Sequence, residues 1–261
     1  MKPSHLVALL LLFCLALNGT ASAVVAPDLH RPFATLLQRH VDRGVVDYAA
    51  FQVDVKALDS YLQTLADADL SGTDRATRLA FYINAYNACT IRLILRHFPN
   101  IASIRDIHKP WKTREWKLAG ETLSLDDVEH KKLRRELAEP RIHFAIVCAS
   151  ISCPHLASHA YDSERIDAQL EQAADDFIQA PANVQVEMRK GIFGTRPMLY
   201  LSKIFDWFGG DFESTPQGSV VDFVAAHATA EVAAFIVAHR AELKVDHLPY
   251  DWDLNGKRAA Q

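Results

Sequence analysis

The sequence has few cysteines, no excess of charge of one sign, and no long apolar run beyond its first residues. Acidic and basic residues are mixed along the chain, and the formal net charge is −4. It therefore lacks the basic surface that nucleic-acid phosphates require, and we expect no nucleic-acid partner. No internal repeat, low-complexity tract or shift of composition marks a boundary between domains. The chain is long enough to bury a large core, and we interpret it as one domain.

The first residues resemble a secretory signal peptide. Lys2 precedes an apolar run over residues 6–17, and the small residues Ala-Ser-Ala follow at 21–23. This run has the length of a signal-peptide core and is short for a membrane span. We predict a signal peptide over residues 1–23, cleaved after Ala23, and an exported domain over 24–261 that is periplasmic or secreted. An uncleaved N-terminal anchor is the alternative, and no later segment approaches a membrane span.

Cysteine is scarce, and its count is informative. Loss of Cys14 with the signal peptide leaves Cys89, Cys148 and Cys153. In an oxidising compartment, three cysteines allow one disulfide and a free thiol, or three thiols kept reduced by burial or by chemistry. Cys89 falls on the flank of a helical apolar stripe, which is typical of a small core residue.

Residues 142–156, IHFAIVCASISCPHL, carry the densest group of reactive side chains. Residues 142–148 are mostly apolar and follow Pro140, so we predict a short buried strand there. The loop after a buried strand is a common place for a functional site. This loop carries Cys148, Ser150, Cys153 and His155 in its sequence or at its edges.

A long helix is predicted over residues 75–98, after a linker rich in capping residues and before Pro99. Its apolar residues cover well over half of the circumference, which indicates a mostly buried helix. Asn84 and Asn87 fall outside its narrow polar face, and a buried amide must find hydrogen-bond partners. They either tie nearby loops to the core or line a polar site.

A second helix, ending near residue 137, begins after Ser124, which is spaced for a capping box with Asp127. Glu129 falls in the middle of its apolar stripe, where a carboxylate is costly to desolvate. Such a residue is retained for chemistry or for an internal polar network. His130 lies about 100° further round the helix, so we expect the two side chains not to pair directly and to face different walls of one pocket.

The pattern of predicted elements indicates an α+β fold. Two short hairpins are predicted, over residues 116–123 and 184–201. We expect a small, mostly antiparallel sheet that includes the strand at 142–148. The long buried helix packs against it, and several amphipathic helices flank the core.

Five segments in this order and spacing resemble the domain of unknown function 547 family, found in exported bacterial proteins and in plants. They are VVDYAA, RLAFYINAYNACTI, LSLDDVEHKKLR, HFAIVCASISCPHL and YDWDLN, and the resemblance covers nearly all of residues 24–261. It implies no established activity. Plant members often carry serine at the position of Cys153, so the resemblance does not imply a family-wide disulfide between Cys148 and Cys153. The family's recurring positions correspond here to Asn84, Tyr86, Asn87, Glu129, His130, Cys148, Ser150 and Pro154.

The first functional hypothesis is a non-catalytic binding or structural domain. In it, Glu129, Asn84 and Asn87 brace the loop after residue 148, and the domain binds an unknown cell-envelope protein or a small molecule. Cys148 and Cys153 form a disulfide or simply pack. The candidate binding residues are Asn84, Tyr86, Asn87, Ser150, Cys153 and His155.

The alternative is a thiol hydrolase or acyl transferase with Cys148 as the nucleophile. His130 is the preferred base, with His143 and Glu129 as the other catalytic candidates. His143 is disfavoured because it and Cys148 are separated by an odd number of residues on the predicted strand, and such residues face opposite sides. The chain also lacks a glycine-flanked nucleophile motif.

A metal site is a third possibility, since Cys148, Cys153, His155 and His159 offer nitrogen and sulfur ligands. The four-residue gap between the cysteines is not the usual close spacing for zinc, and Pro154 disfavours a helix there. We therefore predict no metal ligand and no cofactor.

Overall fold

One buried helix, α4 (Arg75–His97), lies at the centre of the larger of two hydrophobic cores. The computed structural model describes residues 28–191 and 194–257. Helix α4 begins where the Asp74 carboxylate accepts a hydrogen bond from the backbone N–H of Thr77, and it ends two residues before Pro99. Nearly all of its residues from Leu79 onward are buried, which confirms the prediction of a buried central helix.

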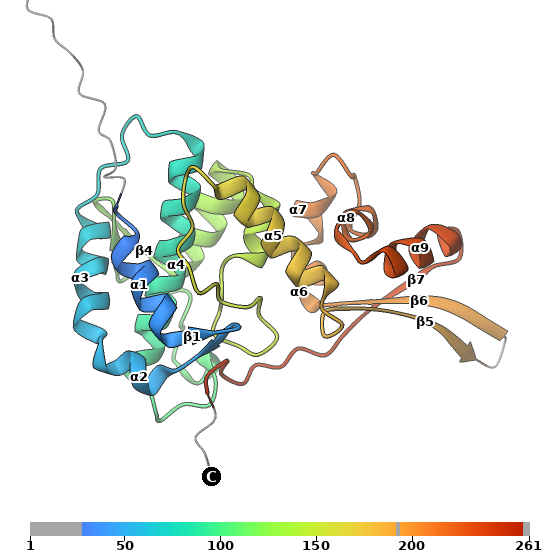
Figure 1. Cartoon of the computed structure of the whole chain (residues 1–261), viewed down its shortest axis with the longest axis horizontal. Helices are drawn as coiled ribbons and strands as arrows, with labels where there is room; N and C mark the ends of the chain where they lie inside the picture. Colours follow the sequence, from blue (N-terminus) through green and yellow to red (C-terminus); the bar gives the residue numbers. More distant parts are fainter. Residues whose placement is uncertain (1–27, 192–193, 258–261) are drawn as a thin grey trace, which may run out of the picture.

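Amphipathic helices and two short hairpins surround α4 (Figure 1). The hairpins β1–β2 and β3–β4 are antiparallel, and β3–β4 is the hairpin predicted over residues 116–123. The elements of this part are α1 (Arg31–His40), β1 (Val41–Asp42), β2 (Val45–Val46), α2 (Tyr48–Val53), α3 (Val55–Ala66), η1 (Ile104–Asp106), β3 (Trp116–Leu118), β4 (Glu121–Leu123) and η2 (Asp127–Glu136).

The second core is built from aromatic side chains around Phe144 and a three-stranded sheet. Strands β5 and β6 are antiparallel, and β7 joins β6 in parallel. The elements are η3 (Pro140–Phe144), α5 (Ile166–Gln179), β5 (Val184–Gly191), β6 (Gly194–Leu201), α6 (Lys203–Trp207), α7 (Gly209–Glu213), α8 (Val220–His227), α9 (Ala230–His239) and β7 (Lys244–His247).

The segment after β7 runs back across the molecule towards the β1–β2 hairpin (Figure 1). On the way it pairs with the central loop, residues 145–161, through the bridge between Ser150 and Leu254. At its end, the Val46 backbone N–H donates to the Asn255 carbonyl at 2.9 Å. This return brings Tyr250 to the loop that carries the cysteines.

The predicted α+β class is confirmed, and one element within it is wrong. Residues 142–148 are not a strand, because Pro140 to Phe144 form the 3-10 helix η3 and the chain then runs without regular structure to residue 148. The strands form three small sheets instead of one. None of the described helices is long and apolar enough to span a membrane. The predicted signal peptide, residues 1–23, lies outside the described residues.

Candidate functional site

Two asparagines on α4 hold the central loop, residues 145–161, at its two ends. Asn87 Nδ2 donates to the Ala145 carbonyl, and the Val147 N–H donates to Asn87 Oδ1, each at 2.9 Å. Asn84 makes the same double contact with the carbonyl and N–H of Tyr161, at 2.8 and 2.9 Å. These bonds satisfy backbone groups that lie buried without a sheet or helix partner. The loop is therefore fixed to the centre of the fold.

The central loop brings Cys148 and Cys153 to disulfide distance, with Cα atoms 6.3 Å apart. The Cys148 N–H donates to Cys153 Sγ at 3.0 Å, which closes a tight turn between them. Ala149 has a φ of +63°, a conformation that is uncommon for a residue with a side chain. Cys89 is a free, buried thiol in the core.

Glu129 projects from η2, which is a π-helix. The reciprocal hydrogen bonds of Ser124 and Asp127 define its start, as their spacing predicts. Burial raises the pKa of Glu129 to about 7. Its nearest polar partner is the Tyr86 hydroxyl, which donates to it over a long 3.5 Å. The carboxyl is thus buried, weakly partnered and able to change protonation near neutral pH.

An ion-pair network lies beside Glu129. Arg134 donates twice to the Asp211 carboxylate, at 2.6 and 2.9 Å, and His143 Nε2 lies 2.8 Å from the same group. Although burial alone would raise the pKa of Asp211, its bonds to His143 and Arg134 hold it well below the ordinary value. Burial lowers the pKa of His143 and of His130. His130 Nδ1 lies 3.1 Å from Arg134 Nη1, within hydrogen-bond distance. The same nitrogen lies 4.0 Å from the Glu129 carboxyl, which is too far for a hydrogen bond.

Aromatic rings from three distant segments form one wall of a pocket beside these groups. Trp207, Tyr250 and Trp252 pack with ring centroids 4.6 to 5.7 Å apart, and Trp111 contacts Trp252 edge-on. The cavity has a volume of about 200 Å³. We call it the aromatic pocket; it is lined by Tyr86, Trp111, Asp126, Glu129, His130, His143, Ile146, Cys148, Cys153, Pro154, Ile204, Trp207, Phe208, Tyr250 and Trp252.

Residues 70–178 match a family model described as protein of unknown function, DUF547. This part of the chain belongs to the DUF547 family. The comparisons with curated proteins and with solved structures give no match. The segments VVDYAA and YDWDLN lie outside the matched range, yet the fold joins them to each other, because Tyr48 donates to the Asn255 side chain at 2.8 Å.

The DUF547 region, residues 204–208 and the segment after β7 together form the aromatic pocket, which contains part of the predicted site. Of the sequence candidates, Tyr86, Glu129, His130, His143, Cys148 and Cys153 line it. Asn84 and Asn87 support the loop. Ser150 is buried, does not line the pocket, and donates a hydrogen bond to the Tyr250 hydroxyl. His155 lines a separate cleft of about 750 Å³.

The predicted catalytic pairing is not formed in the structure. No hydrogen bond among the described residues joins Cys148 to His130 or His143, and His143 instead stacks on Phe208. Cys148 contacts Cys153, Ser150 and Tyr250. The partners of Cys148 in this geometry are therefore the second cysteine and two hydroxyl groups, and neither histidine is among them.

Several residues of the site were not singled out from sequence, chiefly Arg134 and Asp211 of the ion-pair network and Tyr250 of the aromatic pocket. They lie far apart along the chain, and no local pattern places them together. Arg134 lies on the exposed side of a predicted helix, where a cation is ordinary. Tyr250 belongs to the YDWDLN segment, so its membership of a recurring segment was the only signal.

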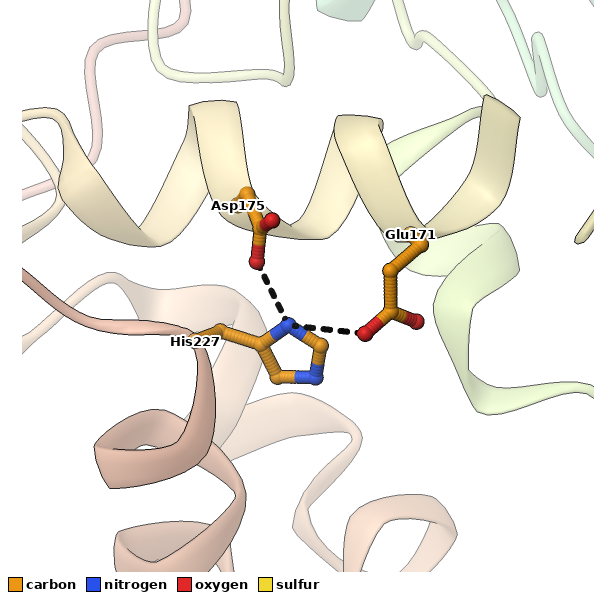
Figure 2. Close-up of side chains that lie close together, drawn as sticks. All are labelled: Glu171, Asp175 and His227. Atoms are coloured by element: carbon orange, nitrogen blue, oxygen red, sulfur yellow. Dashed lines mark hydrogen bonds and ion pairs between the residues drawn. The ribbon is translucent and has the colours of Figure 1, made fainter. Parts of the chain in front are cut away.

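A second cluster lies where α5 meets the end of α8 (Figure 2). His227 Nδ1 faces both Asp175, at 2.8 Å, and Glu171, at 3.7 Å. The three donor atoms lie within 4.8 Å of one another, a spacing that a divalent cation could bridge. Arg141 already donates to Glu171 at 3.2 Å, so these side chains satisfy one another as ion pairs. The proposed quartet of Cys148, Cys153, His155 and His159 does not form such a cluster among the described residues.

Proposed function

We propose that this is a binding domain whose aromatic pocket takes a neutral, ring-sized apolar side chain of a partner polypeptide. The observation that carries the proposal is the aromatic wall: Trp207 leaves 45% of its surface exposed at the edge of a cavity of about 200 Å³. Exposed aromatic rings around a concave site are typical of binding surfaces.

The charges in and beside the aromatic pocket favour a neutral group over an anion, since the Asp126 carboxylate lines it. Arg134 and Asp211 neutralise each other. Burial lowers the pKa of His130, which keeps the imidazole uncharged at neutral pH. With a pKa of about 7, Glu129 is protonated in a large fraction of molecules and can donate a hydrogen bond to a peptide carbonyl.

The surface around the aromatic pocket favours a polypeptide over an isolated small molecule. Ile151, on the loop between the cysteines, is also 45% exposed. It lies between Cys148 and Cys153, which both line the aromatic pocket, so the loop of the pocket exposes apolar surface as Trp207 does. A chain segment covers such a surface better than a compact ligand does.

Panning a library of random seven-residue peptides on the full protein tests this function. We expect enriched peptides to carry an aromatic or large aliphatic residue. Trp207→Ala should weaken their binding about tenfold or more, because a central aromatic contact carries much of the energy of an interface. Met188→Ala is the matched control, since Met188 is 47% exposed on β5 and lies outside the aromatic pocket. Failure of any peptide to be enriched, or binding that Trp207→Ala leaves intact, would overturn the proposal.

We further propose that the partner lies in the cell envelope, reached by export and cleavage after Ala23. The support is the N-terminal sequence pattern alone. Intact-mass measurement of protein recovered from outside the cytoplasm should give a chain beginning at Val24. A mass that begins at Met1 would contradict this location step and would leave the pocket proposal standing.

A further inference from the structure

Fixed hydrogen-bond donors surround the cysteine pair, and a backbone N–H points at Cys153 Sγ. The backbone N–H of Cys148 donates to Cys153 Sγ at 3.0 Å. The Tyr250 hydroxyl donates to the same sulfur at 3.3 Å and also lies 3.4 Å from Cys148 Sγ. Ser150 Oγ donates to the Tyr250 oxygen at 3.1 Å, which leaves the phenol proton directed at sulfur. Hydrogen bonds to a charged acceptor are about twice as strong as those to a neutral one. These donors therefore stabilise a Cys153 thiolate more than a disulfide sulfur.

The donors are held in place before any reaction. Ile151 N–H donates to the Asp253 carbonyl at 2.9 Å, and Asp251 N–H donates to Ser152 Oγ at 2.8 Å. These bonds align the C-terminal segment with the loop directly after Tyr250. The phenol therefore does not have to be ordered when a thiolate forms, and preorganised donors are the most effective.

The two sulfurs differ in exposure. Both cysteines line the aromatic pocket, but Cys153 is buried, with 7% of its surface exposed, whereas Cys148 is half-buried. An incoming thiolate reaches Cys148 first, and Cys153 is then the leaving group. Exchange is faster when the leaving thiolate is stabilised.

We propose that Cys148 and Cys153 are a redox-active pair that exchanges with thiols of a polypeptide bound in the aromatic pocket. The inference rests on the proposed function, in that the bound polypeptide delivers the thiol. A partner thiolate forms a bond to Cys148 Sγ, the bond between the two cysteines breaks, and its electron pair goes to Cys153 Sγ. A second partner thiolate then attacks the partner sulfur of this mixed disulfide and releases the Cys148 thiolate.

The net reaction oxidises a partner dithiol to a disulfide and reduces the cysteine pair to two thiols. Two electrons pass from the partner to the pair, and the two partner thiol protons are passed on to Cys148 and Cys153. A second polypeptide that carries a disulfide returns the pair to its oxidised form by the reverse steps. Glu129 lines the same pocket, and its pKa of about 7 suits it to accept and return a proton.

The first test places the full protein in buffers that contain both glutathione and glutathione disulfide, followed by acid quenching, alkylation and peptide mapping. We expect the Cys148–Cys153 pair to be half reduced within the range of these mixtures. A structural disulfide stays oxidised even in glutathione alone. That result, or two thiols that never oxidise in glutathione disulfide, would overturn the inference.

The second test measures the rate at which dithiothreitol reduces the pair. Tyr250→Phe keeps the ring and removes the donor, so reduction should slow about tenfold. Tyr200→Phe is the matched control, because that hydroxyl bonds to Glu187 at 2.9 Å on the β5–β6 hairpin. Equal rates for Tyr250→Phe and the wild type would refute the role of the phenol.

A trapping variant separates this inference from the proposed function. Cys153→Ser should accumulate a mixed disulfide with glutathione at Cys148, whereas Cys148→Ser should leave the buried Cys153 largely unmodified. Peptide binding without any exchange would refute the redox inference alone. Exchange with glutathione in a protein that binds no peptide would refute the proposed function and retain the chemistry of the cysteine pair.

Discussion

Replacing Asn87 by alanine should lower the free energy of unfolding by roughly 3 to 4 kcal/mol. The substitution removes the side-chain amide, which makes two hydrogen bonds to the central loop. The Ala145 carbonyl and the Val147 N–H are then buried without hydrogen bonds. Each orphaned buried group costs roughly 1 to 3 kcal/mol, so the loss of both exceeds the effect of an ordinary core substitution. Urea unfolding followed by tryptophan fluorescence measures the change.

The exposed Asn100 provides the control for Asn87. Asn100→Ala should stay within about 0.5 kcal/mol of the wild type. Asn84→Ala should approach the cost of Asn87→Ala, since it orphans the N–H and carbonyl of Tyr161. If Asn87→Ala unfolded at the same urea concentration as Asn100→Ala, the loop would have other support than α4.

The hydrogen bonds that hold the loop involve two polar side chains on the buried face of an apolar helix. A helix that is apolar over most of its circumference has no reason to carry Asn84 and Asn87 on its buried side unless they have partners. The periodicity therefore predicts that these amides are bonded inside the protein, but the partners are backbone groups in a loop more than 50 residues away. No local pattern specifies which backbone they reach.

The strand predicted over residues 142–148 shows that an apolar run alone does not identify a strand. A short run bounded by breakers fits a buried strand and any other buried extended segment equally well. Here Asn87 takes the place of a neighbouring strand by bonding Ala145 and Val147. The backbone is satisfied without a ladder, and this tertiary contact decides the outcome.

The helix that carries Glu129 was placed correctly, but its type was not. A π-helix turns less per residue than the α-helix that we assumed when placing these residues around the helix axis. Such helices are rare in proteins, and many of those that occur lie at functional sites. Glu129 remains buried all the same, because its neighbours in the stripe are apolar. The aromatic wall could not be predicted from the sequence for another reason. Trp207 and Tyr250 come into contact only when the last segment folds back.

Glu129→Gln should make the protein more stable at pH 8, by roughly 3 kcal/mol, and leave it nearly unchanged at pH 4.5. The ordinary pKa of this carboxyl is 4.5 and burial raises it to about 7 in the folded protein. Between these values the folded state holds a proton that the unfolded state has released. Stability therefore falls as the pH rises from 4.5 to 7. Glutamine carries no charge at any pH, so the variant does not undergo this loss.

Thermal unfolding of both proteins across this pH range tests the prediction, and a gain of several degrees is expected above pH 7. Other groups titrate in both proteins, so the difference between them isolates Glu129. Glu231→Gln, at an exposed position in the first turn of α9, should shift little at any pH. A variant less stable than the wild type at pH 8 would show that the ionised carboxylate has strong partners and belongs to a structural network. A more stable one would mean that the chain keeps a destabilising acid in the aromatic pocket, which is expected of a group retained for function.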